Sequence, residues 1–145
     1  MRHNKFISAA IALCVIAFFT TASVPSASAL TPVPVTITGV YDFTNFPNTT
    51  GTFTASGTLG NLSGTSTMHV DLNPTNGIRA HCVVTLIASD GTGTIIIHQQ
   101  CEFATPYPYR GRWEIVNGTG AYANLRGNGS LTMPDDQEAM TGFIY

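Results

Sequence analysis

The chain has 145 residues, the length of a single domain. Residues 30–145 contain four arginines, no lysine and eight acidic residues, which gives this part a net charge of −4. Nucleic acids bind through a basic surface, so this balance predicts no nucleic-acid partner. The chain also lacks a basic amphipathic segment of the kind that binds a membrane surface.

The beginning of the chain has the three-part pattern of a secretion signal. A basic start is followed by an apolar run over 6–19 and by a small-x-small cleavage site at 27–29. The apolar run is too short to span a bilayer. The sequence therefore predicts a signal peptide over 1–29, a single domain over 30–145, and a secreted protein, extracellular or periplasmic, without a membrane span after cleavage.

Short segments of alternating apolar and polar residues run through the rest of the chain. Threonine, glycine, serine and valine dominate these segments, and helix-forming runs are nearly absent. Turn residues separate them every 10 to 15 positions, a spacing typical of an all-β sandwich or barrel. We expect eight strands, at 34–44, 51–59, 63–72, 79–89, 94–103, 111–117, 127–133 and 139–145.

The fourth and fifth of these strands are expected to form a hairpin that brings two cysteines together. With the turn centred on Gly91-Thr92, Cys82 lies directly opposite Cys101, and opposed residues of an antiparallel pair are close enough for a disulfide. An exported chain meets an oxidising compartment, where such a pair is usually bridged. We therefore predict a structural disulfide. The redox-active alternative lacks the Cys-x-x-Cys spacing that lowers a thiol pKa.

The same register divides the hairpin into an apolar and a polar face. The face with the cysteines is expected to form the core, with Gln99 as its polar exception, and it carries Val84, Leu86, Ala88, Ile95 and Ile97. Alternation adds three residues of the preceding strand to this face: Met68, Val70 and Leu72.

The polar face gathers histidines and acids: His69, Asp71, His81, His98 and Glu102. The register places His81 opposite Glu102. Only His69, His81 and one of the two acids could converge on a point, whereas a metal needs three or four ligands. We interpret this face as solvated surface, with a metal or acid–base site as the alternative, and expect no metal and no cofactor.

Aromatic residues supply the candidates for ligand binding. The segment Tyr107-Pro108-Tyr109-Arg110 forms a loop before the sixth strand, and loops at a barrel rim commonly make the binding contacts. Tyrosines beside an arginine suit a carbohydrate or a phenolic ring; the alternative is a rigid turn that covers the barrel end. A second group is expected in the core, with lining of an open cavity as the alternative: Phe43, Phe53, Trp113, Tyr122 and Phe143.

A glycine-rich corner occupies residues 111–131. The strand that contains Trp113 runs into Gly118-Thr119-Gly120, then Tyr122, then a second glycine pair at Gly127 and Gly129. Glycine is used where a backbone turns with positive φ or passes close to another chain. The pattern predicts a tight corner between two strands, and no nucleophile or phosphate-binding loop is attached to it.

This corner resembles the Gly-Thr-Gly-aromatic corner of the allene oxide cyclase and dirigent barrels. It is more similar still to a group of small exported bacterial proteins of that barrel type without an assigned activity, in which segments like Gly51–Gly57 and Ser89–Thr94 precede the corner in this order. The resemblance spans most of 51–131. It implies an eight-stranded antiparallel β-barrel whose interior is either filled or holds one small ligand.

Three functions are open for such a barrel. The first is a module without enzymatic activity that binds a small apolar or aromatic ligand through Phe43, Tyr107, Tyr109, Trp113 and Tyr122. The second is an isomerase or cyclase of the allene oxide cyclase type. The resemblance then offers Asp42 as the cavity acid, although Thr44 stands where the cyclases have an asparagine. The third is a structural or interaction module of the cell surface with a filled barrel. The residues do not indicate an oligomeric state.

Overall fold

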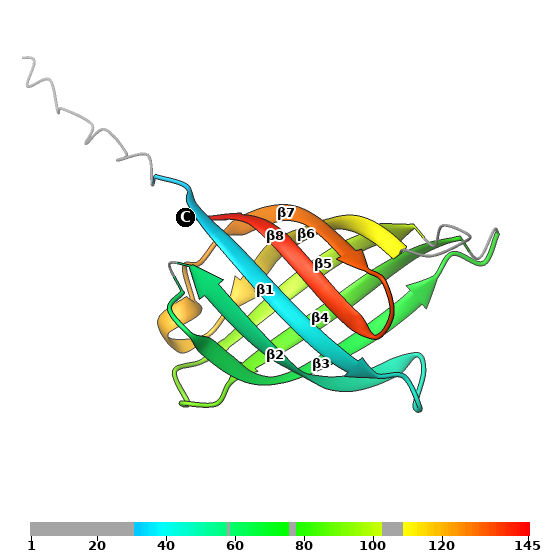
Figure 1. Ribbon diagram of the computed structural model, residues 1–145, viewed down its shortest axis with the longest axis horizontal. Helices are drawn as coiled ribbons and strands as arrows, with labels where there is room; N and C mark the ends of the chain where they lie inside the picture. The colour runs from blue at the N-terminus through cyan, green and yellow to red at the C-terminus, as the bar shows by residue number, and fades with distance from the viewer. Residues whose placement is uncertain (1–30, 58, 76–77, 103–108) are drawn as a thin grey trace, which may run out of the picture.

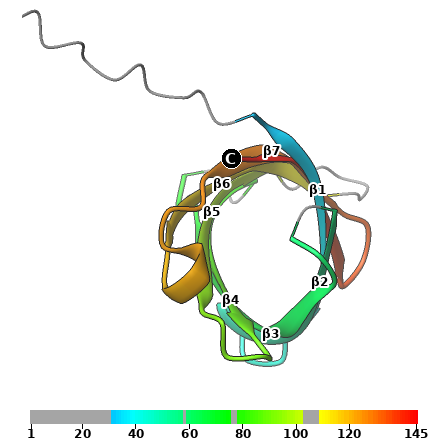
Figure 2. The same ribbon diagram turned by 90° about the vertical axis from the view of Figure 1, so that its left-hand side faces the viewer.

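Eight antiparallel strands close into a barrel in the computed structural model, which describes residues 31–57, 59–75, 78–102 and 109–145. The strands are β1 (Val33–Asp42), β2 (Asn48–Gly57), β3 (Leu62–Leu72), β4 (Arg79–Ala88), β5 (Thr94–Glu102), β6 (Tyr109–Gly118), β7 (Gly127–Met133) and β8 (Gln137–Ile144). Each strand pairs with its neighbours in the chain, and β8 pairs with β1 (Figures 1 and 2). The predicted eight-stranded antiparallel barrel is confirmed. The predicted signal peptide over 1–29 lies outside the described residues.

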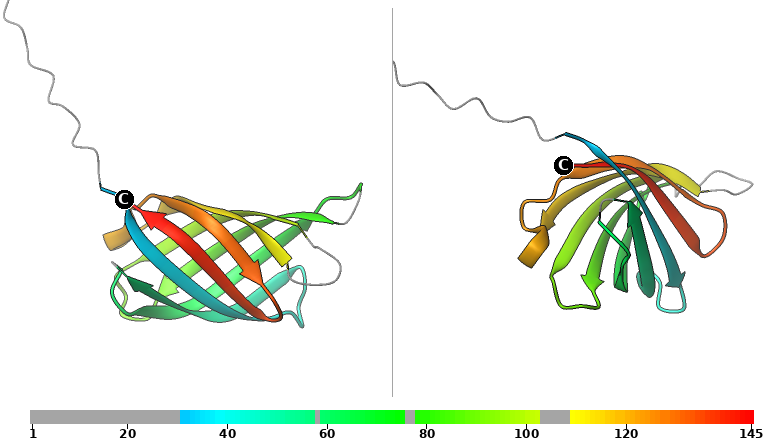
Figure 3. Two further views of the ribbon diagram at one scale, coloured as in Figure 1. Left: turned by 45° about the horizontal axis from the view of Figure 1, so that its top comes forward. Right: turned by 60° about the vertical axis from the view of Figure 1, so that its left-hand side comes forward.

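The two ends of the barrel differ. One end carries the β2–β3, β4–β5 and β6–β7 connections and the 3₁₀ helix η1 (Gly120–Tyr122), which faces the viewer in Figure 2. The other end carries the β1–β2 and β7–β8 connections, the ends of β3 and β5 and the starts of β4 and β6, and it is called the mouth below. The strands run obliquely from one end to the other (Figure 3). Within the described part of the chain, no helix has the length and apolar character needed to cross a membrane.

Strict alternation along the strands fills the interior with the predicted apolar face. Both cysteines and Gln99 point inward and are buried, as are all the predicted core residues of β3 to β5 except one. That exception is Leu72, which is 43% exposed because it is the last residue of β3. The prediction of Phe143 as a core residue is also wrong. It is 54% exposed, because Ile144 takes the inward position beside it on β8.

The β4–β5 register differs from the predicted one by two positions. Cys82 pairs with Gln99 and Cys101 pairs with Ala80, so the cysteines are not directly opposed. The turn is centred on Asp90-Gly91, and the Asp90 carboxylate holds it by accepting hydrogen bonds from the Thr92 backbone N–H at 2.9 Å and the Thr92 hydroxyl at 2.7 Å. Side chains alternate between the two faces of a strand, so a register shift of two residues keeps each side chain on its predicted face. The cross-strand partners, however, were predicted wrongly.

Trp113 is the largest fully buried side chain, and two glycines make room for it. Its indole Nε1 donates to the backbone carbonyls of Ser130 at 3.1 Å and Thr141 at 3.2 Å. Gly129 and Gly142 are paired on β7 and β8, and a Cβ atom at Gly142 would lie only 2.8 Å from the indole Cζ2. Trp113 therefore packs against a part of the wall that has no side chains.

The glycine-rich corner joins β6 to β7, as predicted, and it contains η1, which was not predicted. Gly120 has φ of +59°, a conformation that residues with a side chain rarely adopt. Tyr122 of η1 is half-buried at the end opposite the mouth, where its hydroxyl lies 2.8 Å from the Thr92 hydroxyl. It fastens the corner to the β4–β5 turn and is not a core residue.

Candidate functional site

A cavity of about 360 Å³ opens at the mouth of the barrel. Its walls are apolar side chains, and two carboxylates stand at its edge: Phe43, Met68, Val70, Tyr109, Met133, Pro134, Asp135 and Asp136 line it. This end lies at the right in Figure 1. The volume is at the lower end of the range of small-molecule sites in proteins, and an apolar wall with a few polar groups is typical of them.

The cavity walls come from the inward positions of strand ends. Met68 and Val70 are near the end of β3, Tyr109 begins β6 and Met133 ends β7, and all four are 5% exposed or less. Phe43 follows β1 directly and is 37% exposed, so its ring stands at the rim. Methionine side chains adapt their shape to what they contact. The cavity is therefore lined by two flexible methionine side chains and two aromatic rings.

A polar network lies in the barrel interior beside this cavity. Glu138 is fully buried and accepts a hydrogen bond from Gln99 Nε2 to its Oε1 at 2.8 Å and one from the Tyr41 hydroxyl to its Oε2 at 3.3 Å. The three side chains come from β8, β5 and β1. A buried carboxyl group requires such partners, because its transfer out of water is costly.

Burial sets the protonation of this network. It raises the pKa of Glu138 to about 7, against an ordinary value of 4.5, while the hydrogen bonds from Gln99 and Tyr41 lower it in part. Burial, and next the Glu138 charge, raise the pKa of Tyr41 well above its ordinary value. The phenol is therefore neutral, and the carboxyl group exchanges its proton close to neutral pH.

Two contacts connect the cavity with the interior. The ring of Phe43 at the rim packs against that of Tyr41, with centroids 6.3 Å apart. The hydroxyl of Tyr109 lies 3.4 Å from Cys82 Sγ. Cys82 and Cys101 are free thiols, both buried, and the hydrogen bond between them, followed by burial, raises the pKa of Cys101.

The structure brings two of the predicted ligand-binding residues together and separates the others. Phe43 and Tyr109 share the cavity, and Tyr109 is buried there rather than exposed in a loop. Trp113 lies in the core and is not a lining residue, and Tyr122 is at the opposite end. Tyr107 lies outside the described residues.

Asp42, the candidate catalytic acid, is not in the barrel interior. It is the last residue of β1, and alternation turns it outward beside the inward Tyr41. Its exposed carboxylate accepts hydrogen bonds from the Thr44 backbone N–H at 2.9 Å and from the Thr44 hydroxyl, which lower its pKa. It stabilises the β1–β2 turn, and the expectation of a cavity acid at this position is wrong.

The histidines of the outer face form two separate contacts. His69 lies 2.7 Å from Asn48 through Nδ1 and 3.2 Å from Asp71 through Nε2. His81 packs edge-on against His98, with ring centroids 5.0 Å apart. The predicted pairing of His81 with Glu102 is wrong, because the shifted register places Gln100 opposite His81. Over the described ranges, no group of three histidine, cysteine or acidic side chains is arranged to hold a metal ion.

Glu138, Met68 and Met133 were not predicted as site residues, although the sequence contained an indication of a buried partner such as Glu138. Gln99 was already a polar exception on the core face, which indicates a buried polar partner. The last strand was expected to begin at residue 139, whereas β8 begins at Gln137 and places Glu138 inward.

Comparison of this chain with known proteins identifies no relative. No family model, no curated protein and no solved structure matches it.

Proposed function

We propose that this protein is an exported barrel of the allene oxide cyclase and dirigent-like type that binds a small apolar or aromatic ligand at its mouth. The observation that carries the proposal is the apolar cavity of about 360 Å³, which has Phe43 and Tyr109 in its wall. The closed eight-stranded barrel and the corner over 111–131 support the family assignment, and the sequence pattern of 1–29 supports export.

The other two hypotheses have less support. Catalysis of the cyclase type would need an acid inside the cavity, but Asp42 is exposed and Glu138 does not line the cavity. The two acids that do line it, Asp135 and Asp136, are exposed at its edge. A purely structural module agrees with the filled barrel interior, but it gives no role to the open mouth cavity, whose volume exceeds the roughly 300 Å³ at which small-molecule sites begin. Binding without catalysis agrees best with the described residues.

Replacement of Phe43 by alanine is expected to weaken the binding of a neutral aromatic probe about fivefold to tenfold. N-phenyl-1-naphthylamine is such a probe, and its fluorescence rises in an apolar site. Phe43 is at the rim, so its loss removes an aromatic contact worth about 1 kcal/mol without opening the core. The measurement is a fluorescence titration of the wild-type protein and the variant.

Phe143→Ala is the matched control for this experiment, because Phe143 is an exposed phenylalanine of the outer wall. Its loss is expected to leave the affinity for the probe unchanged. Equal weakening by both substitutions would show that the probe adheres to exposed phenylalanines in general. The absence of binding to the wild-type protein would reject the proposed function.

The proposal includes a disulfide between Cys82 and Cys101 in the exported protein. The two thiols occupy the same inner face of neighbouring strands, and a hydrogen bond already joins them. Diagonal neighbours lie about 7–8 Å apart, at the upper limit of the range that a disulfide spans, so formation of the bridge would require a small movement of β4 against β5.

The disulfide is tested on protein collected from the export compartment. We expect protein unfolded in the presence of an alkylating reagent to take up no label, and its mass to be lower by two hydrogen atoms than that of the reduced chain. After reduction, both cysteines should be labelled. Complete labelling without reduction would contradict the disulfide and leave the thiols as part of the buried network.

A further inference from the structure

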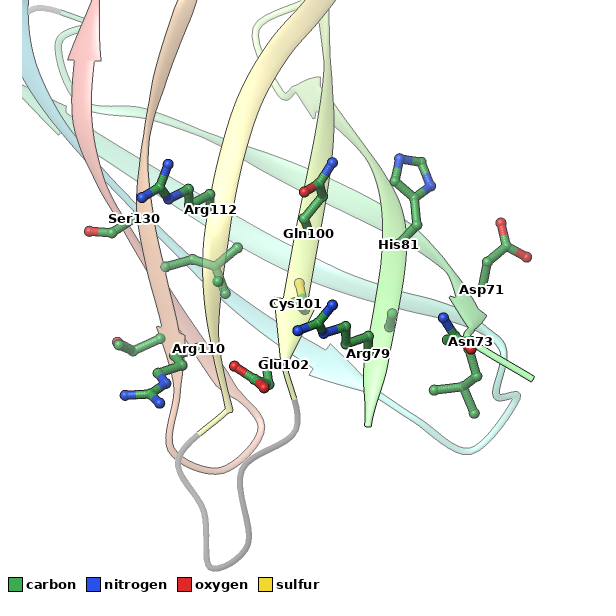
Figure 4. Close-up of a pocket in the computed structure, with 15 residues that line it drawn as sticks. Asp71, Asn73, Arg79, His81, Gln100, Cys101, Glu102, Arg110, Arg112 and Ser130 are labelled. Atoms are coloured by element: carbon green, nitrogen blue, oxygen red, sulfur yellow. The ribbon is translucent and has the colours of Figure 1, made fainter. Parts of the chain in front are cut away.

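The outer wall carries a second concave site, separate from the mouth cavity. A shallow, open cleft of about 900 Å³ runs across the outward faces of β3 to β7. Its charged and polar side chains include Arg79, His81, Gln100, Glu102, Arg110 and Arg112 (Figure 4). All six are exposed.

The cleft concentrates the positive charge of the protein. Residues 30–145 contain four arginines and no lysine, and three of the four arginines line this cleft. Arg110 and Arg112 are two positions apart on β6, so their side chains leave the same face roughly 6.6 Å apart along the strand. Two positive charges on the same face of one strand favour the approach of an anion.

Few acidic groups neutralise these arginines. Glu102 lies between Arg79 on one side and Arg110 on the other, because it pairs with both across the strands. The Asp71 carboxylate, at the edge of the cleft, already lies 3.2 Å from His69 Nε2. Among the described residues, no ion pair joins any of the three guanidinium groups to a carboxylate.

Arg112 is the guanidinium group with the most favourable surroundings for an added anion. Its neighbours across the strands are Gln100 on β5 and Ser130 on β7. Both are uncharged and can bind hydroxyl groups. A guanidinium group binds a carboxylate with two parallel hydrogen bonds. The cleft thus offers positions for carboxylates beside positions for hydroxyls.

We propose that this cleft binds an acidic saccharide, with its carboxylates on Arg110 and Arg112 and its hydroxyls on Gln100 and Ser130. A nucleic acid fits less well, because single strands bind by stacking on aromatic side chains and none of the described lining residues is Phe, Tyr or Trp. This site does not depend on the mouth cavity.

The test uses trigalacturonic acid as the probe, at low ionic strength, with a neutral galactose trisaccharide and an oligothymidylate of equal charge for comparison. Binding is followed by NMR through the side-chain amide of Gln100. The double variant Arg110→Gln, Arg112→Gln is expected to weaken trigalacturonate binding about tenfold, as the loss of two exposed ion pairs predicts. Glu102→Gln is expected to strengthen it, because a repulsive charge is removed.

Arg126→Gln is the matched control, since Arg126 is the one arginine of residues 30–145 outside the cleft. It should leave the affinity unchanged. Equal loss in this control, equal binding of the neutral trisaccharide, tighter binding of the oligothymidylate, or no binding of trigalacturonate would each overturn the proposal. Phe43→Ala should not affect trigalacturonate binding, so the two sites are tested separately.

Discussion

Replacement of Trp113 by alanine is expected to lower the free energy of unfolding by about 3–5 kcal/mol. The indole fills the barrel between the glycine pair Gly129–Gly142 and the opposite wall, and it is 2% exposed. Its removal leaves a cavity that these strands cannot close, because a closed barrel cannot contract around one residue. Urea unfolding of the wild-type protein and the variant measures the difference.

Two further variants identify the cause of the loss. Trp113→Phe keeps one aromatic ring and removes the other together with the Nε1 hydrogen bonds to Ser130 and Thr141, so a smaller loss of about 1–2 kcal/mol is expected. Phe143→Ala on the outer wall should change the free energy by about 0.5 kcal/mol or less. Trp113→Phe should also bind the aromatic probe like the wild type. A large loss of probe binding in this variant would show that Trp113 contributes to the binding site.

Replacement of Glu138 by glutamine is expected to make stability less dependent on pH. Burial raises the pKa of the folded-state carboxyl group to about 7 from an ordinary value of 4.5. The folded state therefore holds this proton more tightly than the unfolded state does. Its contribution to stability is complete below pH 4.5 and is lost as the pH rises through about 7.

The magnitude follows from the two pKa values. The wild-type protein should lose about 3 kcal/mol relative to Glu138→Gln between pH 4.5 and 7, with no further change above this range. Asp42 and Asp90 have lowered pKa values and act in the opposite direction, but they are present in both proteins and cancel in the difference. Parallel stability curves from pH 4.5 to 8 would show that the pKa of Glu138 is the same in the folded and unfolded states, which would contradict the raised pKa.

The fold could be predicted from local patterns because each strand has its own signal. Alternation of apolar and polar residues determines the strands, and the glycines of the corner determine where the chain turns. The β4–β5 register could not be predicted in the same way, because Asp90-Gly91 and Gly91-Thr92 are both acceptable turn centres. The hydrogen bonds from Thr92 to Asp90, which fix the turn, depend on geometry and not on residue type alone.

The binding site was predictable only in part, for a related reason. Phe43 and Tyr109 could be proposed individually as aromatic residues near strand ends, but their meeting at one mouth depends on the closure of the whole barrel. Glu138 was missed because the start of a strand is the least certain part of a sequence prediction. Adjacent residues of a strand point to opposite faces, so either Tyr41 or Asp42 had to point inward. In β1 the inward residue is Tyr41.

The central claim is that the mouth cavity, and not the barrel core, receives the ligand. The three methionines of the described chain test it directly, because Met68 and Met133 line the cavity whereas Met140 is fully buried and does not. We predict that titration with N-phenyl-1-naphthylamine, followed by NMR of ¹³C-methyl methionine, shifts the signals of Met68 and Met133 and leaves that of Met140 in place. A shift of Met140 alone, or of none of the three while the probe binds, would contradict the account.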